Sequence, residues 1–307
     1  MPELPDIVVY LDAIERVIVS HPLSGVRLQS PFVLRSVEVP PSAAIGTKLR
    51  SVRRLGKRIS LEFDGELFLV IHLMIAGRLQ WKPAVGGKLP AAAGKIGLVA
   101  FDFDHGSLLF TEASSKKRAS LHVVRGKAAL EPFDRGGLEP LGASLADFAA
   151  TLRLENRTLK RALTDPTLFS GIGNAYSDEI LHRARSSPFA LTSKLEDDAI
   201  TRLHAATQAV LTEWIDRLRR ETAGSWPSKV TAFRPEMAVH GRFDQPCPVC
   251  GTKVQRISYA ENEANYCPTC QTDGKLLADR GLSKLLRGDW PKTLGELEER
   301  KRRLKGD

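Results

Sequence analysis

The sequence has no long hydrophobic run, and this shortage excludes a protein that crosses a membrane as a helix. Its longest apolar stretches, such as residues 67–73, are far shorter than the roughly 20 residues that a transmembrane helix needs. Residues 1–6 also lack the positive charge and the apolar segment of a secretory signal. We therefore expect a cytoplasmic protein without a membrane partner.

Cysteine is scarce as well, and all four cysteines of the 307 residues lie close together near the C-terminal end. A disulfide framework spreads its cysteines along a small secreted chain, so clustering in a large chain indicates metal binding. Cys247 and Cys250 form one C-x2-C pair, and Cys267 and Cys270 form another after sixteen residues. Four thiolates suit one tetrahedral Zn²⁺ and leave no position for water, so we predict one structural zinc ion.

The charge of the chain is unbalanced towards the positive side. The sequence contains 45 Lys and Arg against 36 Asp and Glu, a formal net charge of +9. A basic protein attracts polyanions, among which nucleic acids are the commonest. Because many basic proteins bind no nucleic acid, charge alone does not identify the partner.

Residues 1–130 are expected to form a mostly β domain. Residues 64–65 (Asp-Gly) and 105–106 (His-Gly) each separate two apolar runs, which indicates a β-hairpin. Residues 83–97 are rich in Pro, Gly and Ala and predict a loop between the two hairpins. Residues 6–20 are the exception, because their apolar side chains recur at helical spacing.

The rest of the chain is expected to contain further parts. Residues 131–143 hold several prolines and glycines and are assigned to a linker. Residues 144–234 have helical periodicity and predict a helical domain. Residues 235–280 contain the cysteines, with a β-hairpin between the two pairs, and residues 281–307 form a basic helical extension.

The helical pattern is interrupted at residues 171–174, which read Gly-Ile-Gly-Asn. Glycines let a ligand approach the backbone, and the free N–H groups at the start of the following helix suit a phosphate. The same residues also suit a plain packing joint between two helices. The interruption by itself leaves both interpretations open.

Three motifs occur together in this chain: Met-Pro-Glu-Leu-Pro at residues 1–5, Gly-Ile-Gly-Asn-Ala-Tyr-Ser-Asp-Glu-Ile-Leu at residues 171–181, and the two cysteine pairs. In this order, over nearly the whole chain, they resemble the formamidopyrimidine-DNA glycosylase / endonuclease VIII family. The resemblance implies an α+β multidomain fold: an N-terminal β-sandwich with flanking helices, a helix–two-turn–helix domain and a C-terminal four-cysteine zinc finger. It also implies a monomer in the bacterial cytoplasm, associated with the nucleoid, that binds DNA and flips the damaged nucleotide out of the stack.

The resemblance assigns the chemistry to Pro2, Glu3 and Lys57. Removal of Met1 would expose Pro2 as a secondary amine, and a terminal amine titrates near ~8, so a useful fraction is nucleophilic at neutral pH. Attack on C1′ of the deoxyribose would expel the base, and elimination of phosphate would follow. Glu3 lies beside the nucleophile and can move protons to the sugar. Lys57 matches a hairpin lysine that contacts the phosphate next to the lesion.

Further matches concern the grip on DNA. Asn174 and Lys160 match phosphate-contacting residues of the family, and such contacts position DNA without reading its sequence. Ile75 stands where the family has an intercalating methionine. Lys116 and Arg118 lie where the family usually has arginines followed by phenylalanine and glycine, so the aromatic wedge is missing. These departures leave the opposite-base preference open and favour unpaired or single-stranded substrates.

Other departures concern the finger and the substrate. Asn262 occupies the position of the family's key arginine, and an asparagine cannot grip phosphate with a charged bidentate fork. Arg256 or Lys253 are candidates to replace it. Residues 224–239 are shorter than the lesion-capping segment of enzymes specialised for 8-oxoguanine. This favours an endonuclease VIII-like range of lesions, or an unusual lesion such as a crosslink.

We therefore predict a base-excision-repair DNA glycosylase with AP-lyase activity, which removes oxidised or ring-opened bases from damaged double- or single-stranded DNA. Three alternatives remain. A glycosylase directed at crosslinks or single strands is one, and a protein that binds abasic or damaged DNA and has lost catalysis is another. A zinc-ribbon RNA-binding protein would explain the charge and the cysteines, but not residues 1–5 or the glycine turn.

Overall fold

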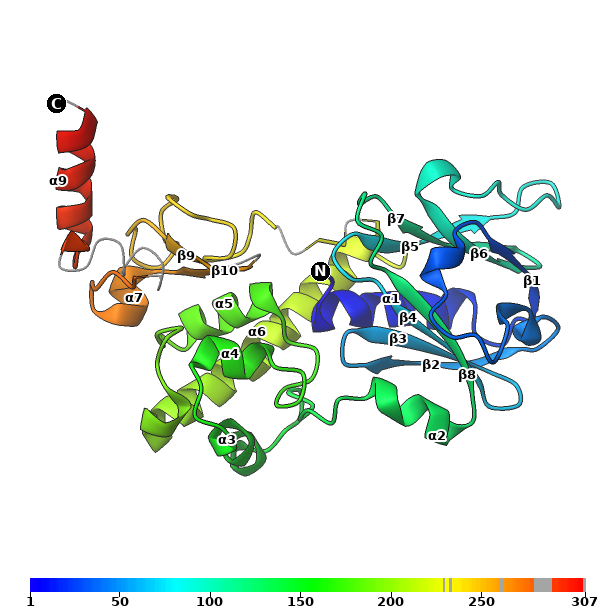
Figure 1. Ribbon diagram of the computed structural model, residues 1–307, viewed down its shortest axis with the longest axis horizontal. Coiled ribbons are helices and arrows are strands. Elements are labelled where there is room, and N and C mark those ends of the chain that lie inside the picture. The colour runs from blue at the N-terminus through cyan, green and yellow to red at the C-terminus, as the bar shows by residue number, and fades with distance from the viewer. Residues whose placement is uncertain (229, 232–233, 260–261, 279–288, 306–307) are drawn as a thin grey trace. The chain divides into compact units, whose positions relative to one another are not determined.

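The computed structural model divides into two compact units, drawn in Figure 1. The first comprises residues 1–137 and 212–232, and the second comprises residues 138–211 and 233–307. The residues not described are 229, 232–233, 260–261, 279–288 and 306–307. Only the backbone is described at residues 259, 262, 301, 304 and 305.

Two four-stranded antiparallel sheets form most of the first unit (Figure 1). In one sheet the strands have the order β1 (Leu23–Leu28), β6 (Gly97–Phe103), β7 (Gly106–Glu112) and β5 (Gly77–Pro83). In the other they have the order β2 (Leu49–Leu55), β3 (Arg58–Phe63), β4 (Leu67–His72) and β8 (Ser120–Arg125). The predicted β-sandwich is confirmed, and both predicted hairpins are present as β3–β4 and β6–β7.

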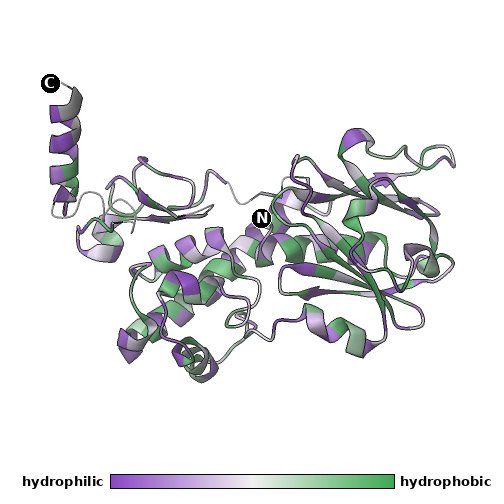
Figure 2. Ribbon diagram, viewed as in Figure 1, coloured by the Kyte–Doolittle hydropathy of each residue, from purple (hydrophilic) through white to green (hydrophobic). Residues whose placement is uncertain are grey.

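Strand β4 shows why the longest apolar run of the sequence is a strand that is buried on both faces. Leu69 and Ile71 belong to the main core between the sheets. Phe68 and Val70 point to the other face and pack with Leu130 of the short helix α2 (Lys127–Leu130). When a strand is covered on both faces, its sequence is a continuous apolar run and does not alternate between apolar and polar residues. Figure 2 shows the strands of this unit as largely hydrophobic.

The strand register brings several connecting segments to one edge of the sandwich. Arg58, His72 and Ser120 form one row, because Arg58 pairs with His72 and His72 pairs with Ser120. Gly77 pairs with Glu112 in the other sheet. The segments that begin or end in these two rows are residues 56–57, 73–76 and 113–119. The pairing therefore gathers three connections that are far apart in the sequence.

Helix α1 (Leu4–Val17) lies against β2 and β3. The predicted helix over residues 6–20 is thus confirmed, but it starts earlier, at Leu4, and ends earlier, at Val17. Pro5 sits in the first turn, where its missing N–H leaves no intrahelical bond unmade. One face of α1, including Ile7 and Ile14, is completely buried in the core.

Residues 212–232 belong by their contacts to the first unit, whereas the predicted helical domain covers residues 144–234. Trp226 donates its Nε1–H to the carbonyl oxygen of Leu79 at 2.8 Å, and Val230 is buried in the sandwich core. Arg219 pairs with Asp12 of α1 at 2.8 Å. Helical periodicity identifies the helix, but it does not reveal which core its far end joins.

The second unit contains the predicted helices and the cysteine-bearing hairpin. Its elements are α3 (Leu145–Arg153), α4 (Leu159–Thr164), α5 (Asn174–Arg183), most of α6 (Asp197–Thr222), β9 (Gln255–Tyr259), β10 (Asn262–Tyr266), α7 (Pro268–Thr272) and α9 (Leu294–Lys305). The hairpin predicted between the cysteine pairs is confirmed as β9–β10. Figure 2 shows α9 as hydrophilic along most of its length, as its charged sequence requires.

Within the described ranges, no helix combines the length and the apolar character needed to cross a bilayer.

Candidate active site and metal centre

The amino terminus lies in the first unit, directly before α1. Pro2 is buried, and the Glu3 side chain is only 2% exposed. Glu3 is the N-cap of α1, and its backbone N–H donates to Oδ2 of Asp6 at 3.0 Å, in a capping-box arrangement. Asp6 is itself completely buried. The helix start therefore holds two carboxylates next to the chain terminus, and Asp6 performs the capping role at the N3 position.

The terminal amino group is set among charges of both signs. Burial lowers the pKa of the Met1 α-amino group below its ordinary value of 8.0. Arg78 and Lys57 lower it further, whereas Glu3 and Asp6 oppose the shift. A lower pKa leaves a larger fraction of the amine uncharged at neutral pH, and only the uncharged amine is a nucleophile. Arg78, which the sequence analysis did not select, thus acts on the same group as Lys57.

Two of the turns at the sandwich edge carry predicted contact residues. Gly56 and Lys57 form the two-residue connection between β2 and β3, since Leu55 pairs with Arg58. Gly56 has φ +60°, which the first position of such a tight turn requires. Ile75 lies between β4 and β5 and is 60% exposed, so it is an apolar side chain held out at the tip of a turn.

Residues 113–119 form the third connection at this edge, and they carry Lys116 and Arg118, both exposed. The buried carboxylate of Glu112 holds this loop in place. Its Oε1 accepts the backbone N–H of Arg118 at 3.1 Å, and its Oε2 accepts that of Ala119 at 3.2 Å. Glu112 is 1% exposed, so these bonds satisfy a charge that would otherwise be costly to bury.

Lowering the pH from 6.5 to about 4 is expected to destabilise the first unit through His72. Burial lowers the pKa of His72 from 6.5 to about 4, and the charges of Arg58 and Lys57 add to the shift. In this window the unfolded chain binds a proton that the folded chain does not. The free energy of unfolding therefore falls as the pH drops, by up to about 3 kcal/mol. Urea unfolding measured from pH 7 to pH 4 checks this. A His72→Gln variant should lose that part of the slope, and an unchanged slope would contradict the assignment.

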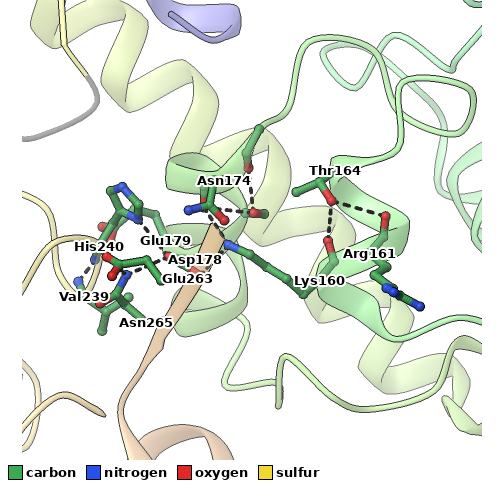
Figure 3. A network of polar contacts seen from close by, with 12 residues as sticks. Lys160, Arg161, Thr164, Asn174, Asp178, Glu179, Val239, His240, Glu263 and Asn265 are labelled. Atoms are coloured by element: carbon green, nitrogen blue, oxygen red, sulfur yellow. Dashed lines mark hydrogen bonds and ion pairs between the residues drawn. The ribbon is translucent and has the colours of Figure 1, made fainter. Parts of the chain in front are cut away.

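The glycine turn lies in the second unit, where Gly173 is the N-cap of α5 and Asn174 is its first residue. Lys160 of α4 reaches this point, but its side chain is only 2% exposed. Its Nζ donates to the carbonyl oxygen of Asn174 at 2.6 Å and to Oδ1 of Asp178 at 2.5 Å (Figure 3). In this structure the ammonium group of Lys160 is thus directed at protein acceptors rather than at the surface.

Asp178 is the centre of a buried network that joins α5 to the segment around the finger. Its Oδ2 accepts from Nδ1 of His240 at 2.8 Å and from Nδ2 of Asn265 at 3.3 Å (Figure 3). The neighbouring Glu179 accepts three consecutive backbone N–H groups, from residues 238–240, at 2.7–2.9 Å. Burial nevertheless raises the pKa of Glu179 above its ordinary value. The two acidic residues of the glycine-turn motif are therefore the anchors that tie this helix to the finger.

The metal centre is formed by the four cysteines at residues 247, 250, 267 and 270, whose sulfur atoms all lie within 4.8 Å of one another. The Sγ atom of Cys250 lies 3.4 Å from that of Cys267 and 3.5 Å from that of Cys270. A tetrahedral Zn²⁺ with Zn–S bonds of about 2.3 Å separates its sulfurs by about 3.8 Å, close to these distances. The donor set fits one zinc ion. His182 places Nε2 3.3 Å from Sγ of Cys247, as a neighbouring N–H donor to a thiolate does.

Removal of this zinc is expected to make all four thiols reactive together. A strong chelator should release one tightly bound equivalent of zinc, and a thiol reagent should then titrate four groups instead of none. The reason is that the metal closes the knuckles, and structural zinc supplies on the order of 10 kcal/mol of binding free energy. Tryptophan fluorescence of the first unit should stay native-like. Full thiol reactivity while zinc is still bound would contradict the four-cysteine site.

The structure brings the predicted site residues together in two groups. Those in the first unit are Pro2, Glu3, Lys57, Ile75, Lys116 and Arg118, and those in the second are Lys160, Asn174 and the four cysteines. Asn262 begins β10 opposite Tyr259, but its side chain lies outside the described residues. The site residues predicted from the sequence do not include Glu112, Asp178, His240 or Asn265. Of these four, only Asp178 had a signal in the sequence, because it belongs to an acidic pair, residues 178–179, inside the motif at residues 171–181.

Comparisons with known proteins agree along the chain. The family model of the formamidopyrimidine-DNA glycosylase N-terminal domain matches residues 1–118. That of the formamidopyrimidine-DNA glycosylase H2TH domain matches residues 137–223, and that of a zinc finger found in FPG and IleRS matches residues 244–272. The Lactococcus lactis FPG structure in complex with a Fapy-dG containing DNA shares the fold, with a TM-score of 0.77 at 24% identity. That alignment covers 88% of this chain and 100% of the other.

Relatives in sequence cover from half to most of this chain. A formamidopyrimidine-DNA glycosylase of Exiguobacterium sibiricum is 31% identical over 289 residues, which cover 88% of this chain and 99% of the relative. An uncharacterized formamidopyrimidine-DNA glycosylase-like protein of Mycobacterium tuberculosis is 44% identical over 151 residues, 49% of this chain and 94% of that protein. Since near-complete alignment at this identity accompanies the three matching domains in their order, the chain belongs to the formamidopyrimidine-DNA glycosylase family.

Proposed function

We propose that this protein is a DNA glycosylase and AP lyase in which the amine of Pro2, freed by removal of Met1, attacks C1′ of a damaged nucleotide. The observation that carries the proposal is the burial of Pro2 beside the buried Glu3. The amino group of Met1, one residue before Pro2, has its pKa lowered by burial, and Arg78 and Lys57 add to that shift. A terminal amine titrates near ~8, and a setting that disfavours the charged form increases the fraction that is nucleophilic at neutral pH. The names of the relatives, formamidopyrimidine-DNA glycosylases, are in line with it.

The reaction proceeds in two stages. The nitrogen of Pro2 forms a bond to C1′ while the bond from C1′ to the base breaks, and the base leaves with a proton. The amine loses its own proton, the bond from C1′ to the ring oxygen O4′ then breaks, and O4′ takes a proton while the nitrogen lone pair completes an iminium ion. This ion withdraws electrons, so the C2′ proton becomes acidic and is lost. The bond from C3′ to the 3′ phosphate then breaks, which nicks the strand. Glu3 is the residue placed to supply a proton to the sugar ring oxygen and to take one back.

The residues at the sandwich edge are proposed to hold the DNA around this amine. Lys57 and Arg78 add positive charge beside the terminus, where the phosphates next to the lesion would lie. Ile75 is the exposed apolar tip that would fill the space left by a flipped nucleotide. Lys116 and Arg118 are displayed on the loop that Glu112 holds, and they would contact the opposite strand or its phosphates.

In the second unit, the half-buried Asn174 at the start of α5 is proposed to contact phosphate through the helix terminus. Lys160 has a positioning role in this proposal, because its Nζ binds the carbonyl oxygen of Asn174 and the carboxylate of Asp178. Its charge also adds to the positive end of the helix. With Asn262 in place of an arginine, Arg256 and Lys253 on or near β9 are proposed to contact phosphate in its stead. Each would first exchange an acidic partner, since Arg256 lies 3.7 Å from Glu263 and Lys253 lies 3.5 Å from Asp244.

For the substrate we propose oxidised pyrimidines, ring-opened purines and abasic sites, with single-stranded or unpaired DNA accepted. Solved complexes of Lactococcus lactis FPG hold Fapy-dG, abasic-site and oxidised-pyrimidine DNA. The missing aromatic wedge at residues 116–121 favours weak discrimination of the opposite base. A cleavage panel of these lesions and of crosslinks, in single and double strands, is the direct measurement.

The central test is reductive trapping. The full-length protein is incubated with abasic-site DNA and sodium borohydride, which reduces an iminium ion to a permanent crosslink. A covalent protein–DNA product is expected. If this chain gives none while another family member does under the same conditions, the enzyme proposal fails.

A second candidate function is a binding protein for abasic or damaged DNA that has lost catalysis, and Asn262 in place of the family's arginine favours it. Binding without trapping, at an affinity that falls steeply with salt, would support this candidate over the enzyme.

A further inference from the structure

A cluster of metal-binding side chains lies in the first unit, apart from the four cysteines. His21 follows α1, and Asp104 and His105 form the turn between β6 and β7. One nitrogen of each histidine and one carboxylate oxygen of Asp104 lie within 4.8 Å of one another. The rings of His21 and His105 are 4.1 Å apart between centroids. Two imidazoles and a carboxylate are ligands that borderline divalent metals such as Zn²⁺ accept.

The contacts of His105 require a proton or a metal ion between its Nδ1 atom and the carboxylate of Asp104. Nε2 of His105 lies 2.8 Å from the carbonyl oxygen of Val17, which can only accept, so Nε2 carries the proton. In the neutral ring Nδ1 then carries a lone pair and no proton, yet it lies 2.6 Å from Oδ1 of Asp104. Two lone pairs at this distance repel each other unless a proton or a metal ion lies between them.

The hydrogen bond from Nε2 of His105 to the carbonyl oxygen of Val17 is of the kind that metal-binding histidines usually make. A ligating histidine donates its other N–H to a carboxylate or a backbone carbonyl, which fixes both the tautomer and the ring orientation. Val17 performs this role for His105, and Trp81 packs against the ring with 4.9 Å between centroids. His105 is therefore oriented with its free nitrogen towards Asp104 and His21.

We propose that His21, Asp104 and His105 bind one divalent transition-metal ion, of which Zn²⁺ is the representative, in a second site that is independent of the finger. A tetrahedral site with bonds of about 2.0–2.1 Å separates its N and O ligands by about 3.3 Å. Nδ1 of His21 already lies 3.3 Å from Oδ1 of Asp104. The shorter contact to His105 opens by a small rotation of Asp104, whose side chain is 65% exposed.

The site would join the end of α1 to the β6–β7 hairpin. Glu3 caps the opposite end of this 14-residue helix, about 20 Å away at 1.5 Å per residue, so the metal would stabilise the fold and take no part in the chemistry. Three protein ligands leave a further coordination position for water. Metal binding here is independent of the proposed function.

Metal counting on the full-length, tag-free protein with its finger already filled tests the proposal. After equilibration with excess Zn²⁺ and gel filtration, the wild type should hold two equivalents of zinc, and His21→Gln and Asp104→Asn should each hold one. Competition with a chromophoric zinc chelator should show the second site weakened at least about 10-fold in each variant. Zinc should also raise the Tm of the wild type with the logarithm of its free concentration, and the same rise in His21→Gln should need a free zinc concentration at least about 10-fold higher.

His204→Gln is the matched control, because His204 also places Nε2 2.8 Å from a backbone carbonyl, that of Ala143, but belongs to no described metal-binding cluster. This variant should retain two equivalents. A wild type that holds one equivalent would overturn the proposal in favour of a proton shared by His105 and Asp104. So would a second equivalent that survives in His21→Gln. His21 is the first choice for substitution because its side chain is 41% exposed and its loss leaves the Val17 bond intact.

Discussion

Protein that keeps a residue in front of Pro2 is expected to lose covalent trapping on abasic-site DNA by up to about 10⁶-fold, the scale at which removal of the nucleophile slows a covalent protease. The nitrogen of Pro2 is an amide as long as Met1 is attached, and an amide nitrogen has no available lone pair for attack on C1′. The structure places this terminus in a buried setting beside Glu3. Mass spectrometry of the N-terminus together with borohydride trapping, on processed protein and on protein with an added N-terminal residue, measures the effect.

Two variants separate the amine from its surroundings. Pro2→Gly, once processed, still offers an amine and should retain part of the trapping. Glu3→Gln keeps a side chain of the same size at the N-cap, and it should slow base removal more than it weakens DNA binding. Equal trapping by processed and extended protein would show that another amine, such as that of Lys57, forms the adduct.

Lys160→Met is expected to lower the free energy of unfolding of the second unit by about 3–5 kcal/mol, because it leaves the carboxylate of Asp178 buried with its cation removed. Lys160 and Asp178 are 2% and 0% exposed in their side chains, and their ion pair is 2.5 Å long. Urea unfolding followed by circular dichroism measures the loss. The DNA affinity should fall as well, since the carbonyl oxygen of Asn174 loses its donor.

A double variant and a control make this prediction specific. Lys160→Met combined with Asp178→Leu removes both charges, so it should recover part of the stability lost in the single variant. Lys194→Met alters an exposed lysine of the same unit and should change the free energy of unfolding by no more than about 0.5 kcal/mol. A Lys160→Met protein as stable as the Lys194→Met control would mean that His240 and Asn265 alone satisfy Asp178.

Much of the fold could be predicted because its signals are local. A turn dipeptide between two apolar runs defines the β3–β4 hairpin, and helical periodicity defines α1 and α6. The spacing of the cysteines alone predicts the zinc centre, because two short loops with paired thiols are enough to build a tetrahedral site. The site residues at Pro2, Glu3 and Lys57 were reached through a resemblance of motifs rather than through such local rules.

Other features depend on which residues meet from distant parts of the chain. The sequence does not distinguish Lys160 from an exposed helical lysine, yet its burial against Asp178 changes its proposed role from contacting phosphate to positioning Asn174. In the sequence, Glu112 is recognisable only as the end of a strand. In the folded protein its carboxylate accepts the backbone N–H of Arg118 and so fixes the loop.

The sequence by itself therefore determined the family, the order of the domains, the metal and the choice of Pro2 as the proposed nucleophile, since each depends on residue types at short, recognisable spacings in the chain. The tertiary structure alone decided the environment of those residues: the lowered pKa of the amino terminus, the anchoring of the contact loop, and the convergence of His21 with Asp104 and His105. The physical reason is that burial, dielectric and the meeting of charges arise from contacts between segments far apart in the chain, and no local pattern encodes them.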